Sequence, residues 1–280
     1  MFDRRDLDDD VAAIRDEHAP DAVVLDVAAD FETVPPAAAE DLGLFADGLT
    51  PTSYPTEWLP ADAPSALVAY AGSDFTVGMP GDGTVVWTRQ TTPPAVLVKK
   101  RAEGTPAGFR RFLLSEAFVQ IGTGAPEHFL PFFADAYPDL DAAVPLSPGD
   151  VYQIAAALYD AWVGLQTRES FRAWDETSPR LFDAWADAGS RLEGRLSTLP
   201  GAVARGGTSF AEATEYACSA VKHGLELPAP FAALDTGAFV EYGPEYGVQW
   251  AEKTFEKLET GPDSGAGDSG SSENPESPSE

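Results

Sequence analysis

The residues with the clearest chemical potential form a basic run between positions 99 and 111. Five of the chain's 18 basic residues fall within these 13 positions: Lys99, Lys100, Arg101, Arg110 and Arg111. Glu103 is the only acid in the run, and neither Arg110 nor Arg111 has an acid three or four positions away. Such concentrated positive charge can bind a phosphate, a nucleotide or an acidic partner. We predict an anion site here; the alternative is pairing of these bases with distant acids.

The three histidines supply the other candidate chemistry. None of His18, His128 and His223 lies in His-Glu-x-x-His or His-x-His spacing, so no histidine-rich metal site is indicated. Glu127 precedes His128, and Glu226 follows His223 by three positions. Both pairs offer acid–base groups, although a histidine beside an acid is also common on protein surfaces.

Several catalytic and cofactor motifs are absent from the sequence. There is no Gly-x-Ser-x-Gly elbow, no Gly-x-x-x-x-Gly-Lys-Ser/Thr loop, and no Gly-x-Gly-x-x-Gly after a strand pattern. Cys218 is the single cysteine, so no internal disulfide or cysteine cluster can form. It lies five positions before His223 on one predicted helix, about 140° away around the axis, and we interpret it as a small buried side chain. We therefore expect no catalytic residues, no metal and no cofactor.

Two functional hypotheses follow from these residues. The first is a non-catalytic binding or interaction protein that uses the basic run, with an anionic small molecule or an acidic protein as its partner. The second is an enzyme acting on a small phosphorylated or carboxylated substrate, with His128 or a nearby carboxylate transferring protons. A pocket in which His128 approaches Arg110 would favour the enzyme. Pairing of Lys99, Arg101 and Arg110 with internal acids would weaken both hypotheses.

Composition indicates a folded, strongly acidic protein. The chain has 46 Asp and Glu against 18 Lys and Arg, a formal net charge of −28, and its 44% hydrophobic residues suffice for a core. Charges of this density repel one another in dilute buffer and are screened in concentrated salt. The same charge argues against nucleic-acid binding, which weakens as salt rises. With 13 Arg, 5 Lys and 3 Ile, the composition resembles that of cytosolic proteins of halophilic archaea. This resemblance implies a potassium-rich cytoplasm and salt-dependent folding, and it carries over no function.

The sequence carries no recognisable targeting signal or membrane span. No run approaches the 18 or so apolar residues that a span requires. Arg4-Arg5 could begin a twin-arginine signal, but acids stand where its apolar segment would follow: Asp6, Asp8, Asp9 and Asp10. We expect a cytoplasmic protein that does not bind membranes.

The N-terminal part of the chain is predicted to be helical, and the part after it has the sequence pattern of short strands. Residues 6–50 are interpreted as helical, and a proline-rich loop at 50–64 is expected to be pinned to the core by Tyr54 and Trp58. Residues 66–101 contain four short runs rich in Val, Thr and aromatic residues, separated by Gly and Pro. Because short connections force antiparallel neighbours, we predict a four-stranded antiparallel meander.

A helical period returns over residues 105–260. Helix starts are predicted at Thr105-Pro106, Ser147-Pro148, Ser178-Pro179, Pro126, Pro244 and the Ser209–Glu212 capping box. After Ser147, apolar residues from Val151 to Leu165 form one stripe, so we expect this helix to be central. The predicted fold class is α+β, with residues 1–260 as one integrated domain and the larger helical part covering one face of the meander. Residues 261–280, rich in Gly, Ser, Pro and acids, are predicted to be a disordered tail.

Overall fold

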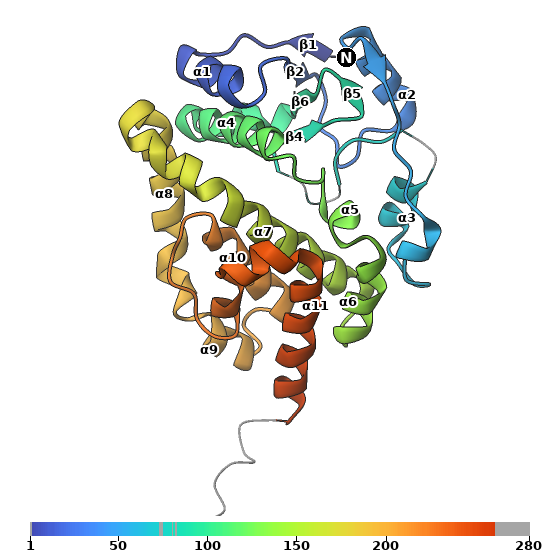
Figure 1. The fold of residues 1–280 in the computed structure, drawn as a ribbon, viewed down its shortest axis with the longest axis vertical. Coiled ribbons are helices and arrows are strands. Elements are labelled where there is room, and N and C mark those ends of the chain that lie inside the picture. Colours follow the sequence, from blue (N-terminus) through green and yellow to red (C-terminus); the bar gives the residue numbers. More distant parts are fainter. Residues whose placement is uncertain (1, 73–74, 80, 82, 261–280) are drawn as a thin grey trace, which may run out of the picture.

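A small mixed sheet lies at the N-terminal side of the computed structural model, which describes residues 2–72, 75–79, 81 and 83–260 (Figure 1). The sheet has the order β1 (Phe2–Arg4), β2 (Val23–Val27), β6 (Ala95–Val98) and β4 (Val85–Thr88). β2 and β6 are parallel, with Val23 opposite Ala95, whereas β1–β2 and β4–β6 are antiparallel. The predicted tail at 261–280 lies outside the described residues.

Both faces of this sheet are covered, as expected for its buried parallel pair. On one face, Val24, Val96 and Trp87 pack with α1 (Asp9–His18) and α4 (Ala107–Thr123). On the other face, the sheet packs with the segment that holds α2 (Pro36–Ala39), the 3₁₀ helix η1 (Glu40–Leu44) and the small β3 (Gly48–Leu49)–β5 (Thr91–Thr92) ladder. The sheet is therefore a central layer of the N-terminal part.

The α+β class is confirmed, but the predicted four-stranded antiparallel meander at 66–101 is wrong. The first run forms α3 (Ser65–Ala71) instead of a strand, and the second contributes only an isolated bridge between Val77 and Val34. The last two runs pair as β4 and β6. The other two strands of the sheet, β1 and β2, come from the N-terminal region. Residues 6–50 are therefore not uniformly helical, in contrast to the prediction. β2 is a short apolar run buried on both faces, and periodicity alone does not separate such a strand from a buried helical segment.

Most of the remaining chain is helical. The helices after α4 are α5 (Phe129–Phe133), α6 (Tyr137–Ala143), α7 (Pro148–Thr177), α8 (Pro179–Leu196), α9 (Leu199–Ala204), α10 (Phe210–Val221) and α11 (Gly237–Thr260). Short 3₁₀ turns connect the elements: η2 (Thr56–Trp58), η3 (Lys100–Gly104), η4 (Ala134–Ala136) and η5 (Phe231–Leu234). Across the described part of the chain, no helix is both long and apolar enough to cross a membrane.

The predicted helix starts are confirmed where a side chain caps the first turn. The Ser147 hydroxyl accepts a hydrogen bond from the Asp150 N–H, and Ser209 and Glu212 form the predicted capping box. α8 begins at Pro179 as predicted, while α4 begins at Ala107, one residue later than Pro106. One predicted start is wrong, because α5 begins after His128 instead of at Pro126. Gly243 has non-helical backbone angles and divides α11 into two segments, and the second of these begins at Pro244, as predicted.

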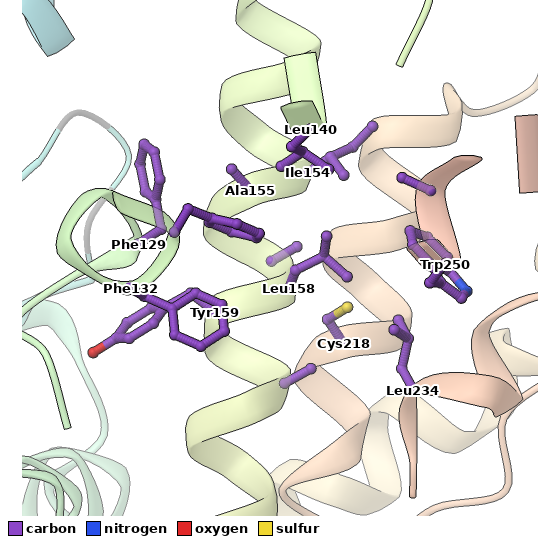
Figure 2. Close-up of a cluster of buried hydrophobic side chains, with 14 of the residues drawn as sticks. Phe129, Phe132, Leu140, Ile154, Ala155, Leu158, Tyr159, Cys218, Leu234 and Trp250 are labelled. Carbon is purple, nitrogen blue, oxygen red and sulfur yellow. The ribbon is translucent and has the colours of Figure 1, made fainter. Parts of the chain in front are cut away.

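The helical core is built around α7, which crosses the middle of the molecule (Figure 1). Figure 2 shows Leu158 of α7 beside Cys218 of α10, in the cluster that also holds Leu234 and Trp250. This confirms the predicted central role of α7 and the interpretation of Cys218 as a small buried side chain. Farther along α7, Phe171 and Trp174 join the second core, with α4 and the sheet. α7 therefore runs through both cores.

Gly164 allows α7 and α10 to approach closely. A Cβ atom on Gly164 would lie 2.9 Å from the Lys222 Cβ and 3.1 Å from its backbone nitrogen. Backbone cannot move aside as a flexible side chain can, so residue 164 must be small.

We expect Gly164→Ala to lower the free energy of unfolding by about 1–3 kcal/mol, because overpacking forces the two helices apart. Gly194→Ala is the matched control. Gly194 is an exposed position of α8 with nothing within 4 Å of its added Cβ, and alanine should stabilise it by about 0.5–1 kcal/mol. Denaturant unfolding of both variants measures the difference. Equal effects of the two substitutions would contradict the close approach.

Candidate functional site

A cavity of about 760 Å³ lies between the sheet side and the helical side of the molecule. α4 lines it with one face, from Phe109 through Leu113 and Glu116 to Gln120, at helical spacing. α7 lines it from Tyr152 to Thr167, which at 1.5 Å per residue is a stretch of about 22 Å. The cavity is therefore elongated. Six aromatic side chains contribute to its wall: Tyr70, Trp87, Phe109, Phe129, Tyr152 and Tyr159.

The segment between α4 and α5 brings two titratable side chains, Glu127 and His128, to this cavity. Arg89 donates hydrogen bonds to the carbonyls of Ile121 and Ala125, and the Tyr159 hydroxyl donates to the carbonyl of Pro126. These bonds join the segment to the β4–β5 turn and to α7. Glu127 and His128 are thus held from two sides, although they lie outside regular structure.

Glu127 is a carboxyl group with a strongly altered proton affinity. The Arg89 N–H donates to its Oε2 at 3.1 Å and the Gln90 amide to its Oε1 at 3.3 Å, and the Thr88 side chain bonds it as well. Burial nevertheless raises the pKa of Glu127 to about 7, because these hydrogen bonds and the Arg89 charge only partly offset the cost of ionisation. The residue keeps some accessible surface because it lines the cavity. It can exchange a proton near neutral pH.

His128 lies beside Glu127 and is held neutral. Its side chain caps α5, with Nδ1 accepting a hydrogen bond from the Leu130 N–H at 3.1 Å, and the residue is only 7% exposed. Burial lowers the pKa of His128 to about 3. The Tyr70 ring meets the imidazole edge to face, with 4.2 Å between centroids.

Tyr54 completes this group of polar side chains. It packs edge to face on His128 at 5.5 Å between centroids and is hydrogen-bonded to Tyr70. Burial first, and then the charge of Glu127, raise the pKa of the Tyr54 hydroxyl, so it stays protonated. This contact confirms that Tyr54 pins the proline-rich loop to the core. We call Tyr54, Tyr70, Glu127 and His128 the Glu127 cluster.

A second polar group in the wall joins α4 to α10. Lys222 Nζ lies 2.7 Å from Glu116 Oε1. Burial works against the charged ammonium, but the Glu116 carboxylate, helped by Asp160, outweighs it and raises the pKa of Lys222. Glu116 itself is buried, and Lys222 is its paired cation. The only charge of Lys222 is therefore committed to a carboxylate of the protein.

The five basic residues of the run at 99–111 do not line this cavity, and they fall into two groups. Arg101 pairs with Glu32 at 2.9 Å and approaches Asp30 at 4.0 Å, and Arg111 forms an ion pair with Asp8. These pairings follow the alternative considered for the run. Distant acids, from the segment after β2 and from the start of α1, reach the two arginines.

The other three basic residues, Lys99, Lys100 and Arg110, lie near the carboxyl ends of the parallel strands β2 and β6. The prediction that Lys99 and Arg101 share one face of a strand is wrong, because β6 ends at Val98. Lys99 is buried, with Nζ 4.7 Å from the centre of the Phe31 ring. Lys100 and Arg110 line a separate cavity of about 370 Å³. The anion site stays a prediction.

The other candidate residues of the sequence have structural roles or lie away from the large cavity. His128 lines the large cavity, whereas Arg110 lines two others, so these two residues do not form the pocket that would favour the second hypothesis. His223 stacks on Trp185, and burial lowers its pKa to about 4. Within the described ranges, no group of three His, Cys, Asp or Glu side chains could hold a metal ion.

Glu127 and His128 are recognisable in the sequence as an adjacent acid–base pair. Tyr70 falls in a run whose pattern predicts a strand, and the members of the Glu116–Lys222 pair are 106 positions apart. No local pattern signals such a distant pair. The combination of an aromatic in a proline-rich loop with Glu127-His128 was the available signal for the cluster.

Comparison with known proteins gives one match. A family model described as "Family of unknown function (DUF7089)" matches residues 1–258. The searches of curated proteins and of solved structures found no match.

We expect Glu127 to make the folded protein less stable as pH rises. Its pKa is about 7 in the folded state against 4.5 in the unfolded chain, so its contribution is fully present below 4.5 and is lost as pH rises through 7. Glu127→Gln should remove on the order of 2 kcal/mol of this decline between pH 5 and pH 8. Denaturant unfolding in molar KCl at both pH values measures it, with the exposed Glu252→Gln as control. The same decline in wild type and Glu127→Gln would refute the assignment.

Proposed function

Because the chain belongs to a family of unknown function, we propose its function from the geometry of its site: it binds a small organic molecule in the cavity of about 760 Å³. The observation that carries this proposal is an aromatic-lined cavity whose wall includes a carboxyl group that exchanges a proton near pH 7. Ligand pockets are typically 300–1,000 Å³, mostly apolar, with a few convergent polar groups. Side chains with altered pKa values cluster in such sites.

The Glu127 cluster supports binding over catalysis. Acid–base catalysis commonly needs two groups whose proton affinities are set apart around the working pH. Here Glu127 changes its protonation state near pH 7, while burial holds His128 neutral and Tyr54 protonated. Arg110, which was expected to hold the substrate of an enzyme, lines other cavities. We therefore favour the non-catalytic hypothesis.

The charges in the wall argue against an anionic ligand. Three acids besides Glu127 line the cavity: Glu116, Asp160 and Glu215. Lys222 lines it too, but its charge is paired with Glu116. Among the described residues that line the cavity, the cation Lys222 is already paired, so an anionic ligand would be repelled by the other carboxylates. We propose a neutral ligand for the cavity, which differs from the anionic partner expected from the basic run.

Filling the cavity should abolish binding. Ala156 lines it from α7, and Ala156→Phe would place a ring where the ligand lies. We expect wild-type protein in molar KCl to bind the neutral, polarity-sensitive dye Nile red with increased, blue-shifted fluorescence. The variant should lose at least about tenfold in affinity, equivalent to 1.4 kcal/mol. Ala173→Phe, at an exposed position of the same helix, should leave binding unchanged. Equal affinity in all three proteins would exclude the cavity as the site.

Affinity for a neutral ligand should fall as pH rises through about 7. The ligand displaces water from Glu127 and makes ionisation harder, so binding takes up a proton. Arg89 and Tyr54 are the charged and titratable groups that act on Glu127, and neither changes its protonation state in this range. Dye titrations between pH 5.5 and pH 8.5 test this. Glu127→Gln should flatten the profile, whereas an affinity that rises with pH would indicate a cationic ligand.

A further inference from the structure

The helices that line the large cavity do so over several turns. On α7 the lining residues Tyr152, Val163 and Thr167 are eleven and four positions apart, so they lie along one side of the helix. On α4 the lining stretch from Phe109 to Gln120 is about 17 Å long at 1.5 Å per residue. A sphere of about 760 Å³ would be only about 11 Å across, which is half of the stretch of about 22 Å on α7. A ligand that fills the cavity is therefore long.

The two ends of the cavity are built from different parts of the chain, because α4 and α7 run in opposite directions along it. At one end, Leu113 lines the cavity, and the ring of its neighbour Phe112 lies 5.5 Å from the ring of Phe171 on α7, between centroids. Beyond the other end of α4, the carbonyl of Pro126 accepts a hydrogen bond from the hydroxyl of Tyr159, which precedes Phe171 by twelve positions. Leu113 therefore lies near one end of the cavity, and the Glu127 cluster lies near the other.

Apolar side chains line the cavity from end to end. Beside the Glu127 cluster, the Phe129 and Tyr152 rings lie 5.0 Å apart between centroids. Farther along α7 the wall continues with the small side chains of Ala156 and Val163. At the opposite end, the Phe109 ring lines the cavity and is 37% exposed. An apolar ligand can therefore contact hydrophobic wall along the whole length.

Polar side chains of the same wall are bonded to one another. The Gln153 amide donates to the Glu215 carboxylate, and the Trp87 indole donates to Gln120 Oε1 at 2.8 Å. The ion pair between α4 and α10 satisfies two further groups. These groups have partners within the protein, so they do not require polar groups spaced along the ligand.

We propose that the ligand is a neutral molecule with a long hydrocarbon chain, which lies lengthwise along α7 from the Glu127 cluster to Phe109. This inference rests on the proposed function, since it names the chemical class of the molecule in the same cavity. Each methylene group that a chain buries in an apolar site contributes a factor of about four to the affinity. A chain that contacts the wall from end to end therefore gains more than a compact molecule, which contacts only one part of it. The carboxylates in the wall argue against an acidic end group.

Two neutral alcohols and two obstructed variants test the proposal. 1-Dodecanol is a linear chain and 1-adamantanol is a compact cage, and each has one hydroxyl group. Ala156→Phe adds a ring in the part of the cavity near the Glu127 cluster, and Leu113→Trp adds one near the opposite end. Both positions are partly exposed, so a larger side chain can be accommodated at each. Equilibrium dialysis in molar KCl gives both dissociation constants in every protein, with the exposed Ala173→Phe as control.

We expect each obstruction to weaken the binding of 1-dodecanol by at least about tenfold, since excluding about two methylene groups from the cavity suffices for that factor. 1-Adamantanol should be weakened by at most one of the two variants, because it occupies only one part of the cavity. Its retained binding also shows that a variant is folded. The smaller substitutions Ala156→Leu and Leu113→Phe should have smaller effects in the same direction, and Ala173→Phe should bind both alcohols as the wild type does.

The lengthwise arrangement is wrong if either obstruction leaves the affinity for 1-dodecanol unchanged, or if the wild type binds 1-adamantanol but not 1-dodecanol. It is also wrong if both obstructions weaken the two alcohols alike, because the cavity then acts as one compact chamber. In each of these cases the cavity remains a binding site. If the wild-type protein binds neither alcohol and does not bind Nile red, the proposed function itself is refuted.

Discussion

An ion pair between the buried Glu116 and the partly exposed Lys222 links α4 to the end of α10 across the wall of the cavity. Glu116 belongs to α4, which packs against α1, β4 and the sheet, and Lys222 follows α10, which packs on α7. Removing Lys222 would leave the buried Glu116 carboxylate without its cation, which destabilises the folded state. Gly164 brings α7 against Lys222, and α4 also packs directly on α7 and α8. The cavity is the space that this arrangement leaves open. Its wall is therefore part of the framework that holds the sheet to the helices.

One physical effect explains the chemical character of the Glu127 cluster. Burial disfavours whichever form of a side chain is charged, so it raises the pKa of Glu127 and of Tyr54 and lowers that of His128. At and below neutral pH these groups tend towards their uncharged forms. A chain with a net charge of −28 thus has a part of its interior wall that is almost free of charge. Surface composition is consequently a poor guide to what the cavity binds.

How far the sequence predicts this protein depends on the range of the interactions involved. Ser147 and the Ser209–Glu212 box were predicted correctly because a helix cap involves residues three positions apart. β2 was missed because a short apolar strand becomes recognisable only beside its partner β6, about 70 positions later. The same holds for the site. Glu127 and His128 are adjacent in sequence, but burial in the fold alters their pKa values. Their neighbours Tyr54, Tyr70 and Gln90 come from distant parts of the sequence that only the fold brings together. The basic run was conspicuous, yet Asp8, Asp30 and Glu32 pair with two of its arginines across the fold.

A neutral ligand also suits the conditions that the acidic composition favours. Concentrated salt shortens the Debye length to about 3 Å at 1 M, so a site that attracts its ligand by charge loses most of its reach there. Apolar burial does not depend on unscreened charge, and excluded salts strengthen it. Recognition by aromatic rings in the cavity would therefore persist in salt that weakens binding at the basic run. On these physical grounds, salt favours the proposed binding site in the cavity over the predicted anion site at the basic run.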